Sequence, residues 1–387
     1  MTEALKRSQF IFAAQYMDMS HEKKSLVAVH GIVCHLPQSS RGYFGWPSVT
    51  QMDDGSLVVV SSGLREWHIC PWGKTVMNIS CDDGASWSQP QVIRDTPIDD
   101  RDAGVISLGG AKLLVSMFSS DPRPFEHETA ADAHMRAGWH DHLTQLYDDE
   151  VAAHAGSWIL LSEDAGKSWS DPIAAPVSAP HGPIRLASGR LLYFGKDARD
   201  LSTAGILCAV SDDDGCTWRV LGEVPLPAGT TSANYHEPHV VELPGGRLVG
   251  LIRIENAAPV VDLEANGFPH FGIMQTESDD GGATWTTART AVVRHGSPPH
   301  LIRHSSGTLV CVYSFRQHPF GQRAMLSYDD GKTWVHDFVI RDDGPTWDLG
   351  YPASVELADG SIFTVYYQQV RVEEPCALLW SRWRLPL

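Results

Sequence analysis

The chain has 387 residues, of which 43% are hydrophobic and 20% charged, and its formal net charge is −17 at pH 7. These values are typical of a globular protein with a substantial core, and they exclude an intrinsically disordered chain. The acidic balance also disfavours nucleic acid and anionic membranes as partners, because both require a basic surface. An anionic small molecule would have to be met by a local cluster of arginines.

The N-terminal residues contain no apolar run long enough for a signal peptide, and no later run reaches membrane-spanning length. The seven cysteines are scattered, odd in number and without C-x-x-C spacing. The histidines of the segment 127–154 lack the i, i+4 spacing of a helical metal site. We therefore expect a cytoplasmic protein with reduced thiols, no metal and no other cofactor.

A short motif, S-x-D-x-G-x-[ST]-W, occurs five times, and each copy follows a short apolar run. The copies are Ser80–Trp87, Ser162–Trp169, Ser211–Trp218, Ser278–Trp285 and Ser327–Trp334. In each copy the Ser and Asp side chains can cap backbone N–H groups, Gly can adopt a positive φ, and Trp can pack beneath the turn. The motif thus predicts a repeated β-hairpin turn and an array of similar units.

A second module recurs six times, as an apolar strand pair interrupted by a glycine turn. Its copies cover residues 46–60, 101–118, 181–195, 237–253, 297–315 and 351–368. Six units of about four short strands predict an all-β fold, a six-bladed β-propeller that forms one domain over residues 1–387. We expect an N-terminal strand to complete the last blade beside the terminal strand Ala377–Trp383.

The second unit carries the longest insertion, residues 119–156. Its middle is the only stretch with helical character. We expect a short helix there, which acts as a lid over the mouth of the central channel.

The candidate site residues are those that open the inner strand of each blade, because these strands converge around the channel. Counting back nine residues from the turn glycines selects Trp46, Glu237 and Tyr351. In the second and third blades the nearest equivalents are Arg101 or Asp102, and His181. An acid, a phenol, an Asp/Arg pair and a histidine at one mouth form an active-site composition.

The five boxes resemble the Asp-boxes of the sialidase (neuraminidase) superfamily. The segment 235–243 is similar to the sialidase segment with the catalytic glutamate, and the segment 350–357 to the one with the tyrosine nucleophile. The resemblance implies that Tyr351 is the nucleophile and Glu237 its base. It also implies that Arg253 and Arg323 bind the carboxylate of the substrate. An adjacent carboxylate is needed because a free phenol is a poor nucleophile at neutral pH.

Two sialidase features are missing from this chain. Gly45-Trp46-Pro47 stands where sialidases have Arg-Ile-Pro, and the loop 63–68 lacks their acid/base aspartate. Arg101 or Arg65 could replace the arginine. Asp102 or His68 could supply the proton. Alternatively, Trp46 offers a flat face on which a less charged sugar would stack.

Together these patterns predict an exo-glycoside hydrolase that releases a terminal acidic sugar from a small oligosaccharide or glycoside, with Asp102 as the proton donor. One alternative is a hydrolase or lyase for neutral or uronic sugars. Another is a glycan-binding propeller without catalysis. The sequence leaves the oligomeric state open, and a homo-oligomer is compatible with it.

Overall fold

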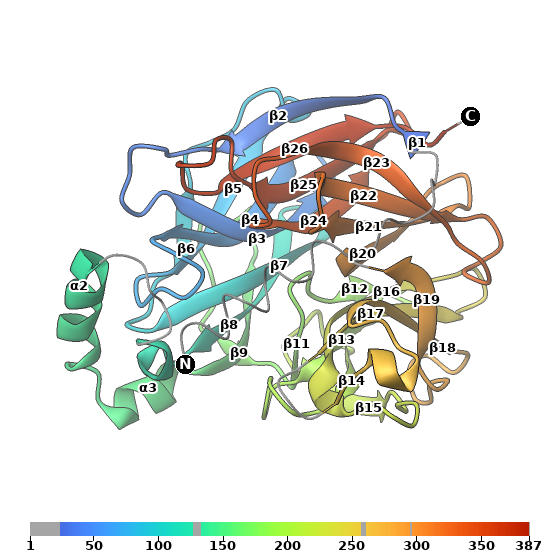
Figure 1. The fold of residues 1–387 in the computed structure, drawn as a ribbon, viewed down its shortest axis with the longest axis horizontal. Helices are drawn as coiled ribbons and strands as arrows, with labels where there is room; N and C mark the ends of the chain where they lie inside the picture. The colour runs from blue at the N-terminus through green and yellow to red at the C-terminus, as the bar shows by residue number, and fades with distance from the viewer. Residues whose placement is uncertain (1–23, 127–132, 257–260, 295, 387) are drawn as a thin grey trace.

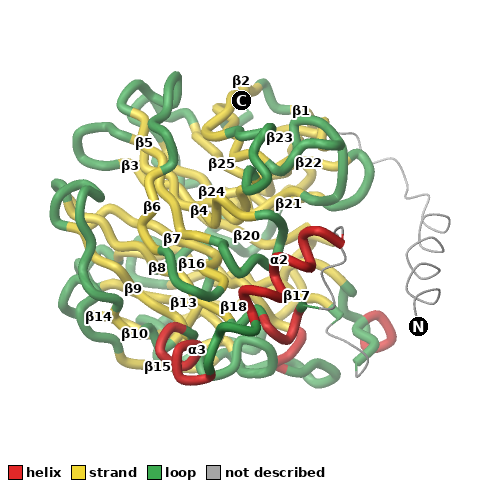
Figure 2. The backbone as a smooth tube through the Cα atoms, turned by 90° about the vertical axis from the view of Figure 1, so that its left-hand side faces the viewer, coloured by secondary structure: helices red, strands yellow, loops and turns green. Residues whose placement is uncertain are grey.

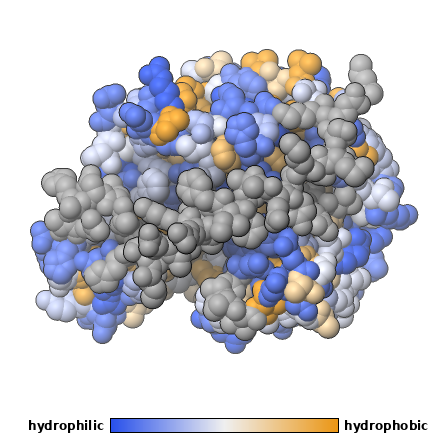
Figure 3. Space-filling model, in the orientation of Figure 1, coloured by the Kyte–Doolittle hydropathy of each residue, from blue (hydrophilic) through white to orange (hydrophobic). Residues whose placement is uncertain are grey.

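The computed structural model describes residues 24–126, 133–256, 261–294 and 296–386. Six sheets, antiparallel except for one short strand, are arranged as a ring, which confirms the six-bladed propeller (Figures 1 and 2). Within these residues no helix is long and apolar enough to cross a membrane. On the face shown in Figure 3, hydrophilic residues predominate and hydrophobic residues form small separate areas.

Each blade is built from consecutive strands, with the innermost strand first in the chain. Blade 1 contains β3 (Tyr43–Gln51), β4 (Leu57–Arg65), β5 (Lys74–Ser80) and β6 (Gln91–Arg94). Blade 2 contains β7 (Asp99–Gly109), β8 (Lys112–Ser120), β9 (Gly156–Ser162) and β10 (Ile173–Ala174). In blade 3, β11 (Val177–Ser178) and β12 (Ile184–Arg185) both pair with β13 (Leu191–Asp197), and β14 (Ile206–Ser211) and β15 (Arg219–Glu223) follow.

The remaining three blades follow the same order. Blade 4 contains β16 (Tyr235–Glu242), β17 (Leu248–Glu255), β18 (Phe271–Ser278) and β19 (Arg289–Arg294). Blade 5 contains β20 (Gly296–Arg303), β21 (Leu309–Phe315), β22 (Phe320–Ser327) and β23 (Val335–Gly344). Blade 6 contains β24 (Leu349–Glu356), β25 (Ile362–Gln368) and β26 (Ala377–Trp383).

The ring is closed by strands from the two ends of the chain. β2 (Ala28–Cys34) pairs antiparallel with β26 as the outer strand of blade 6, which confirms the predicted closure. β1 (Lys24–Ser25) adds to blade 5 in parallel with β23. Blue and red strands consequently lie side by side in Figure 1. This closure pairs the edge of the last blade and holds it in the ring.

The five boxes form the same hydrogen-bonded turn. In the last one, Ser327 Oγ donates to Asp329 Oδ1 at 2.9 Å and accepts from the Gly331 N–H at 2.9 Å. The backbone N–H of Thr333 donates to Asp329 Oδ1 at 2.9 Å. Gly331 has φ of +83°, which explains the need for glycine.

Each box also packs against the preceding blade. A Cβ added to the box glycine would meet a side chain there, and the five pairs are Gly84 with Phe363, Gly166 with Met77, Gly215 with Leu114, Gly282 with Cys208 and Gly331 with Val249. In blade 4, the Trp285 ring stacks on Phe194 of blade 3 with centroids 4.5 Å apart. The boxes therefore fasten five of the six contacts between neighbouring blades.

The insertion of blade 2 lies between β8 and β9. It contains the short 3-10 helix η2 (Arg123–Phe125) and the helices α2 (Ala133–Leu143) and α3 (Asp148–His154), at the left of Figure 1. Trp139 Nε1 donates to Glu66 Oε2 at 3.0 Å, and Trp139 and Leu143 share a small core with Cys70 and Ile98. The insertion thus supports the loop that follows β4 in blade 1. Its predicted role as a lid stays a prediction.

The contact between blades 3 and 4 can be tested with Trp285→Ala. Trp285 is 7% exposed, so its removal leaves a cavity against Phe194. We expect the free energy of unfolding to fall by about 3–5 kcal/mol, measured by denaturant unfolding. Tyr328, which lies in another box and is 62% exposed, is the control. Tyr328→Ala should change the stability by about 0.5 kcal/mol or less, and an equal effect of both substitutions would contradict the assignment.

Candidate active site

A β-bulge near the start of the inner strand places the central side chains. In blades 1, 2, 4 and 6 the register between the inner strand and the second strand shifts at the same point. There, two residues of the inner strand lie opposite one residue of the second strand. The first residue of each bulge is Trp46, Asp102, Glu237 or Tyr351. The four have φ between 47° and 53°, a region that non-glycine residues rarely adopt. Such strained positions cluster at functional sites, and here they aim four side chains at the ring centre.

The centre of the site is a hydrogen-bonded group of three side chains from two distant blades. The Tyr351 hydroxyl donates to Glu237 Oε1. Arg253 Nη1 donates to Glu237 Oε2 at 2.6 Å and lies 3.2 Å from the Tyr351 hydroxyl. Arg253 also donates to Glu255 at 2.5 Å. The structure therefore brings together Tyr351, Glu237 and Arg253, as the sequence predicted.

Charge and burial fix the protonation states of this group. Burial and the charge of Glu237 raise the pKa of Tyr351 well above its usual value, so the phenol keeps its proton. Burial alone would raise the pKa of Glu237 as well. The charge of Arg253 and the hydrogen bonds from Tyr351 and Arg253 outweigh it and lower that pKa. Glu237 is thus an ionised acceptor beside a protonated phenol, which is the arrangement of a base and its nucleophile.

Basic residues stand at or next to the ends of the second strands, and sequence analysis missed two of them. Arg316, just after β21, donates to the Leu349 carbonyl at 3.0 Å and to the Tyr367 hydroxyl at 3.1 Å. Its guanidinium lies 5.8 Å from the centre of the Tyr351 ring. Lys196 of β13 donates to the Tyr235 carbonyl at 2.8 Å, and burial lowers its pKa to about 8. The sequence signal that could have identified Arg316 and Lys196 is a basic residue near the end of the second strand of a blade.

Arg323, the second arginine predicted from the resemblance, is positioned differently. It lies on β22, the third strand of blade 5. Its guanidinium donates to the Arg341 carbonyl at 3.1 Å and to the Pro319 carbonyl at 3.3 Å, and it packs over the Phe315 ring. These contacts hold Arg323 within its own blade. Arg316 is the arginine of blade 5 that reaches the Tyr351 ring.

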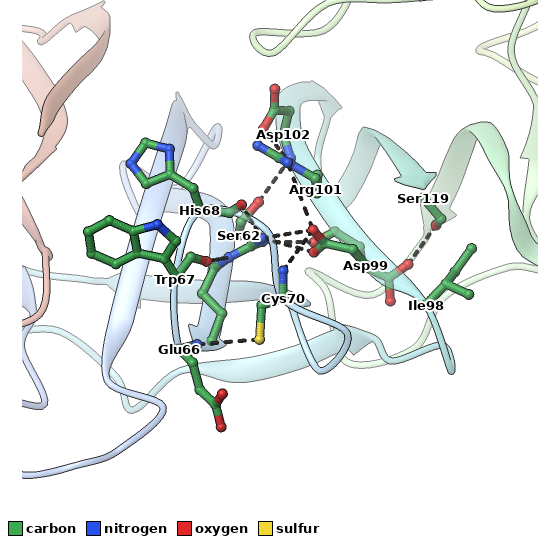
Figure 4. Close-up of polar contacts among 12 residues, drawn as sticks. Ser62, Glu66, Trp67, His68, Cys70, Ile98, Asp99, Arg101, Asp102 and Ser119 are labelled. Atoms are coloured by element: carbon green, nitrogen blue, oxygen red, sulfur yellow. Dashed lines mark hydrogen bonds and ion pairs between the residues drawn. The ribbon is translucent and has the colours of Figure 1, made fainter. Parts of the chain in front are cut away.

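Arg65 has a structural role as well, and its guanidinium is not open to a ligand. It is fully buried and donates to both carboxylate oxygens of Asp99, the residue labelled in Figure 4, at 2.9 and 3.1 Å. It also donates to the carbonyls of Trp67 at 2.8 Å and His68 at 2.6 Å. The suggestion that Arg65 replaces the missing sialidase arginine therefore does not fit this geometry. Arg65 instead holds the loop that carries His68.

Arg101 and Asp102 lie together at the start of the inner strand of blade 2 (Figure 4). Arg101 Nε is 4.0 Å from Asp102 Oδ1, and within the described chain neither atom has a hydrogen-bond partner. Burial raises the pKa of Asp102 to about 6, against the opposing charge of Arg101, and the charge of Glu237 adds to the rise. Each side chain thus has one buried polar atom without a hydrogen-bond partner in the described residues.

Trp46 occupies the bulge of blade 1 but exposes almost no surface. Its ring is 2% exposed, and the guanidinium groups of Arg65 and Arg101 lie 4.9 and 4.7 Å from its centre. The ring contacts Tyr351 edge-on at 6.3 Å and His68 edge-on at 5.4 Å. Trp46 is therefore a packing partner of the site, and a sugar has little of its face on which to stack.

His181 is not beside the Tyr351–Glu237 pair. It lies against two other buried histidines, with ring centres 4.9 Å from His300 and 5.8 Å from His239. His239 and His300 stack on each other at 4.3 Å. Burial lowers the pKa of His239 to about 3 and those of His181 and His300 well below the usual value. The three rings are neutral packing elements of the centre.

A groove of about 780 Å³ lies elsewhere, between the outer strands of blades 2 and 3. Residues such as Trp158, Leu207 and Glu223 line it, and none of the central side chains does. The bulge residues lie outside this groove and contain the hydrogen-bonded Tyr351–Glu237 pair, so they define the candidate active site.

The six blades, the boxes and the central Tyr–Glu–Arg group define a sialidase-like β-propeller. Residues 135–364, more than half of the chain, match the model of the BNR repeat-like domain family, and the chain belongs to this family. No curated protein sequence matches the chain significantly.

Solved structures show the same fold at low sequence identity. A Dyadobacter fermentans protein of unknown function has a TM-score of 0.70 at 22% identity. The match covers 92% of this chain and 98% of that protein. The Trypanosoma rangeli sialidase has a TM-score of 0.61 at 17% identity, over 92% of this chain. This chain spans only 59% of the trypanosomal enzyme. The NanB sialidase of Streptococcus pneumoniae has a TM-score of 0.61 at 12% identity, over 95% of this chain and 71% of that one.

The buried histidines predict a stability that depends on pH. Because the folded pKa of His239 is about 3 and an unfolded histidine titrates near 6.5, its contribution is complete above about pH 6.5 and is lost as pH falls. The difference in His239 protonation between the folded and unfolded states changes the free energy of unfolding by at most about 1.4 kcal/mol per pH unit.

We expect His239→Asn to reduce the slope of stability against pH in unfolding measurements between pH 7 and 4. Asp100 and Asp102, whose pKa values are raised to about 6, act in the opposite direction in both proteins. The comparison of parent and variant therefore isolates the histidine. Equal slopes would contradict the prediction.

Proposed function

We propose that this protein is a glycoside hydrolase that removes a terminal acidic sugar from a small oligosaccharide or glycoside, with Tyr351 as the nucleophile. The observation that carries the proposal is the hydrogen bond from the Tyr351 hydroxyl to the ionised Glu237, beside Arg253. A tyrosine nucleophile is the sialidase exception to the two-carboxylate rule for glycosidases. Two solved sialidase structures similar to this chain contain sialic acid and a covalent 2,3-difluorosialic acid intermediate.

The first step transfers the phenolic proton of Tyr351 to Glu237 while the phenolic oxygen bonds to the anomeric carbon. The bond to the leaving group breaks at the same centre, and the leaving oxygen takes a proton from an acid. Water then gives a proton to the deprotonated acid and attacks the anomeric carbon, the bond to Tyr351 breaks, and the proton returns from Glu237 to the phenolic oxygen. Asp102, with a pKa of about 6, and His68 are the two candidates for the acid.

An acidic sugar suits the cationic groups around this centre. Arg253, Arg316, Lys196 and Arg101 surround the pair, and the buried Nε atoms of Arg253 and Arg101 have no hydrogen-bond partner in the described residues. A substrate carboxylate would supply acceptors for such donors. With a cytoplasmic location, the substrates would be imported oligosaccharides rather than cell-surface glycans.

Substitution of the pair tests the proposal. A panel of 4-methylumbelliferyl glycosides, including acidic sugars, should contain at least one that the parent hydrolyses. Glu237→Gln should lower kcat about 10²–10⁴-fold because the base is lost. Tyr351→Phe should lower it at least as far because no nucleophilic oxygen remains.

Each other outcome points to a different activity. No turnover by the parent together with sugar binding would indicate a glycan-binding propeller. An unsaturated product that absorbs in the ultraviolet would indicate a lyase. Hydrolysis of neutral glycosides alone would limit the proposal to a neutral-sugar hydrolase.

Arg316 provides a second prediction, about the charge of the sugar. Arg316→Ala should raise KM for the acidic glycoside about 10- to 100-fold, because a charge-assisted hydrogen bond contributes about 1.5–3 kcal/mol. KM for the methyl ester of the same sugar should change much less. Arg303, which ends the inner strand of the same blade at its other end, is the control. If Arg316→Ala raises KM equally for the acidic glycoside and for its methyl ester, Arg316 does not bind the carboxylate.

A further inference from the structure

A histidine and an aspartate from opposite ends of the chain form a pair beside the candidate active site. His68 follows β4 in blade 1, and Asp348 precedes β24 in blade 6. His68 Nε2 lies 2.8 Å from Asp348 Oδ1. Within the described residues His68 Nδ1 has no hydrogen-bond partner. The pair therefore leaves one ring nitrogen open for a ligand.

Asp348 is held rigidly in place. It is buried, and the Tyr43 hydroxyl donates to its two oxygens at 3.0 and 3.2 Å. Burial alone would raise the pKa of Asp348, but the hydrogen bonds from His68 and Tyr43 and the charge of His68 lower it. A fixed carboxylate of this kind sets the orientation and the tautomer of the imidazole.

The loop that carries His68 is held from several sides. Arg65 donates to the His68 carbonyl at 2.6 Å and to the Trp67 carbonyl at 2.8 Å. The Cys70 N–H donates to Asp99 at 3.0 Å, and Trp139 of the insertion donates to Glu66 at 3.0 Å. Since the fully buried Arg65–Asp99 pair anchors the loop, His68 is presented by a rigid support.

The exposed fraction of the side chains rises from Tyr351 to His68 and the rings beyond it. A row of rings leads outward from Tyr351 to Trp46 at 6.3 Å, on to His68 at 5.4 Å and then to Trp347 at 6.0 Å. The exposed fractions are 5% for Tyr351 and 2% for Trp46, 26% for the His68 side chain and 54% for Trp347. His68 is therefore partly accessible to solvent and lies one ring, that of Trp46, away from Tyr351.

We propose that the His68–Asp348 pair protonates the leaving group of the reaction described above, so this inference rests on the proposed function. The protonated ring donates Nε2–H to Asp348 and gives its Nδ1 proton to the leaving oxygen as the bond to the anomeric carbon breaks. The neutral ring then takes a proton from the attacking water, which restores the imidazolium. Protons and bonds therefore balance over the two steps.

Asp102 is less well placed for this task. Its side chain is only 11% exposed, and the charges of Arg101 and Glu237 both act on it. Its Oδ1 atom is buried and lacks a hydrogen-bond partner among the described residues. Such an oxygen suits a hydroxyl of the bound sugar, since that hydroxyl would complete its hydrogen bonding.

The test compares leaving groups on the sugar that the parent hydrolyses. A 2,4-dinitrophenyl group leaves without a proton, whereas methanol needs one. We expect His68→Asn to slow the methyl glycoside about 10²–10⁴-fold and the dinitrophenyl glycoside less than about 10-fold. Asp102→Asn should slow both substrates by a similar factor. Asp348→Asn should slow the methyl glycoside more than the dinitrophenyl glycoside, because the ring loses the carboxylate that orients it.

The matched control is another histidine–carboxylate pair, which joins blades 5 and 6. His304 follows β20, and its Nε2 lies 3.3 Å from Oε1 of Glu356, the last residue of β24. His304→Asn should leave the ratio between the two substrates unchanged. An equal loss on both substrates in His68→Asn, or a selective loss in Asp102→Asn, would overturn the proposal.

Failure of the proposed function gives a different result, because the parent would then hydrolyse neither glycoside. A readout without substrate tests the pair itself. In ¹H–¹⁵N spectra of the parent, His68 should carry a proton on Nε2, and Asp348→Asn should shift that resonance. A neutral His68 with its proton on Nδ1 alone would contradict the pair even if hydrolysis is observed.

Discussion

The candidate site depends on one backbone constraint, the two-residue bulge near the start of the inner strands. In a regular strand, alternate side chains would point to the two faces of the blade, where neighbouring blades cover them. The bulge and its positive φ turn Trp46, Asp102, Glu237 and Tyr351 toward the axis instead. Each such residue costs about 1–3 kcal/mol in backbone strain, so the surrounding blades must hold it in place.

The blades are held by the boxes and by closure of the ring. Each box glycine rests on the preceding blade, and the tryptophans of the boxes lie beside these contacts. The contact between blades 6 and 5 has no box. There Trp383 of the last strand packs with Val310 and Val312 of blade 5. Because Tyr351 and Glu237 come from blades 6 and 4, their hydrogen bond exists only when these contacts fix the blade positions.

Opposite charges then set the chemistry within the ring. Burial would neutralise each carboxylate alone, but Glu237 is accompanied by Arg253, whereas Asp102 is less well compensated and has a pKa of about 6. The pKa values of two carboxyl groups at one centre are thus shifted in opposite directions, upward for Asp102 and downward for Glu237. The Arg65–Asp99 pair is fully buried and serves the loop of His68 rather than a ligand.

The sequence by itself determined the number of blades, the closing strand and the bulge residues Glu237 and Tyr351, because repeated turns and strand pairs are local patterns. Tertiary structure decided the roles that depend on position across the sheet. Arg316 and Arg323 are seven residues apart in the same blade. The first follows the second strand and reaches Tyr351, while the second lies on the third strand and binds backbone carbonyls. Likewise, Asp348 meets His68 only because the ring brings blade 6 beside blade 1. No local pattern records which residues such a closure will join.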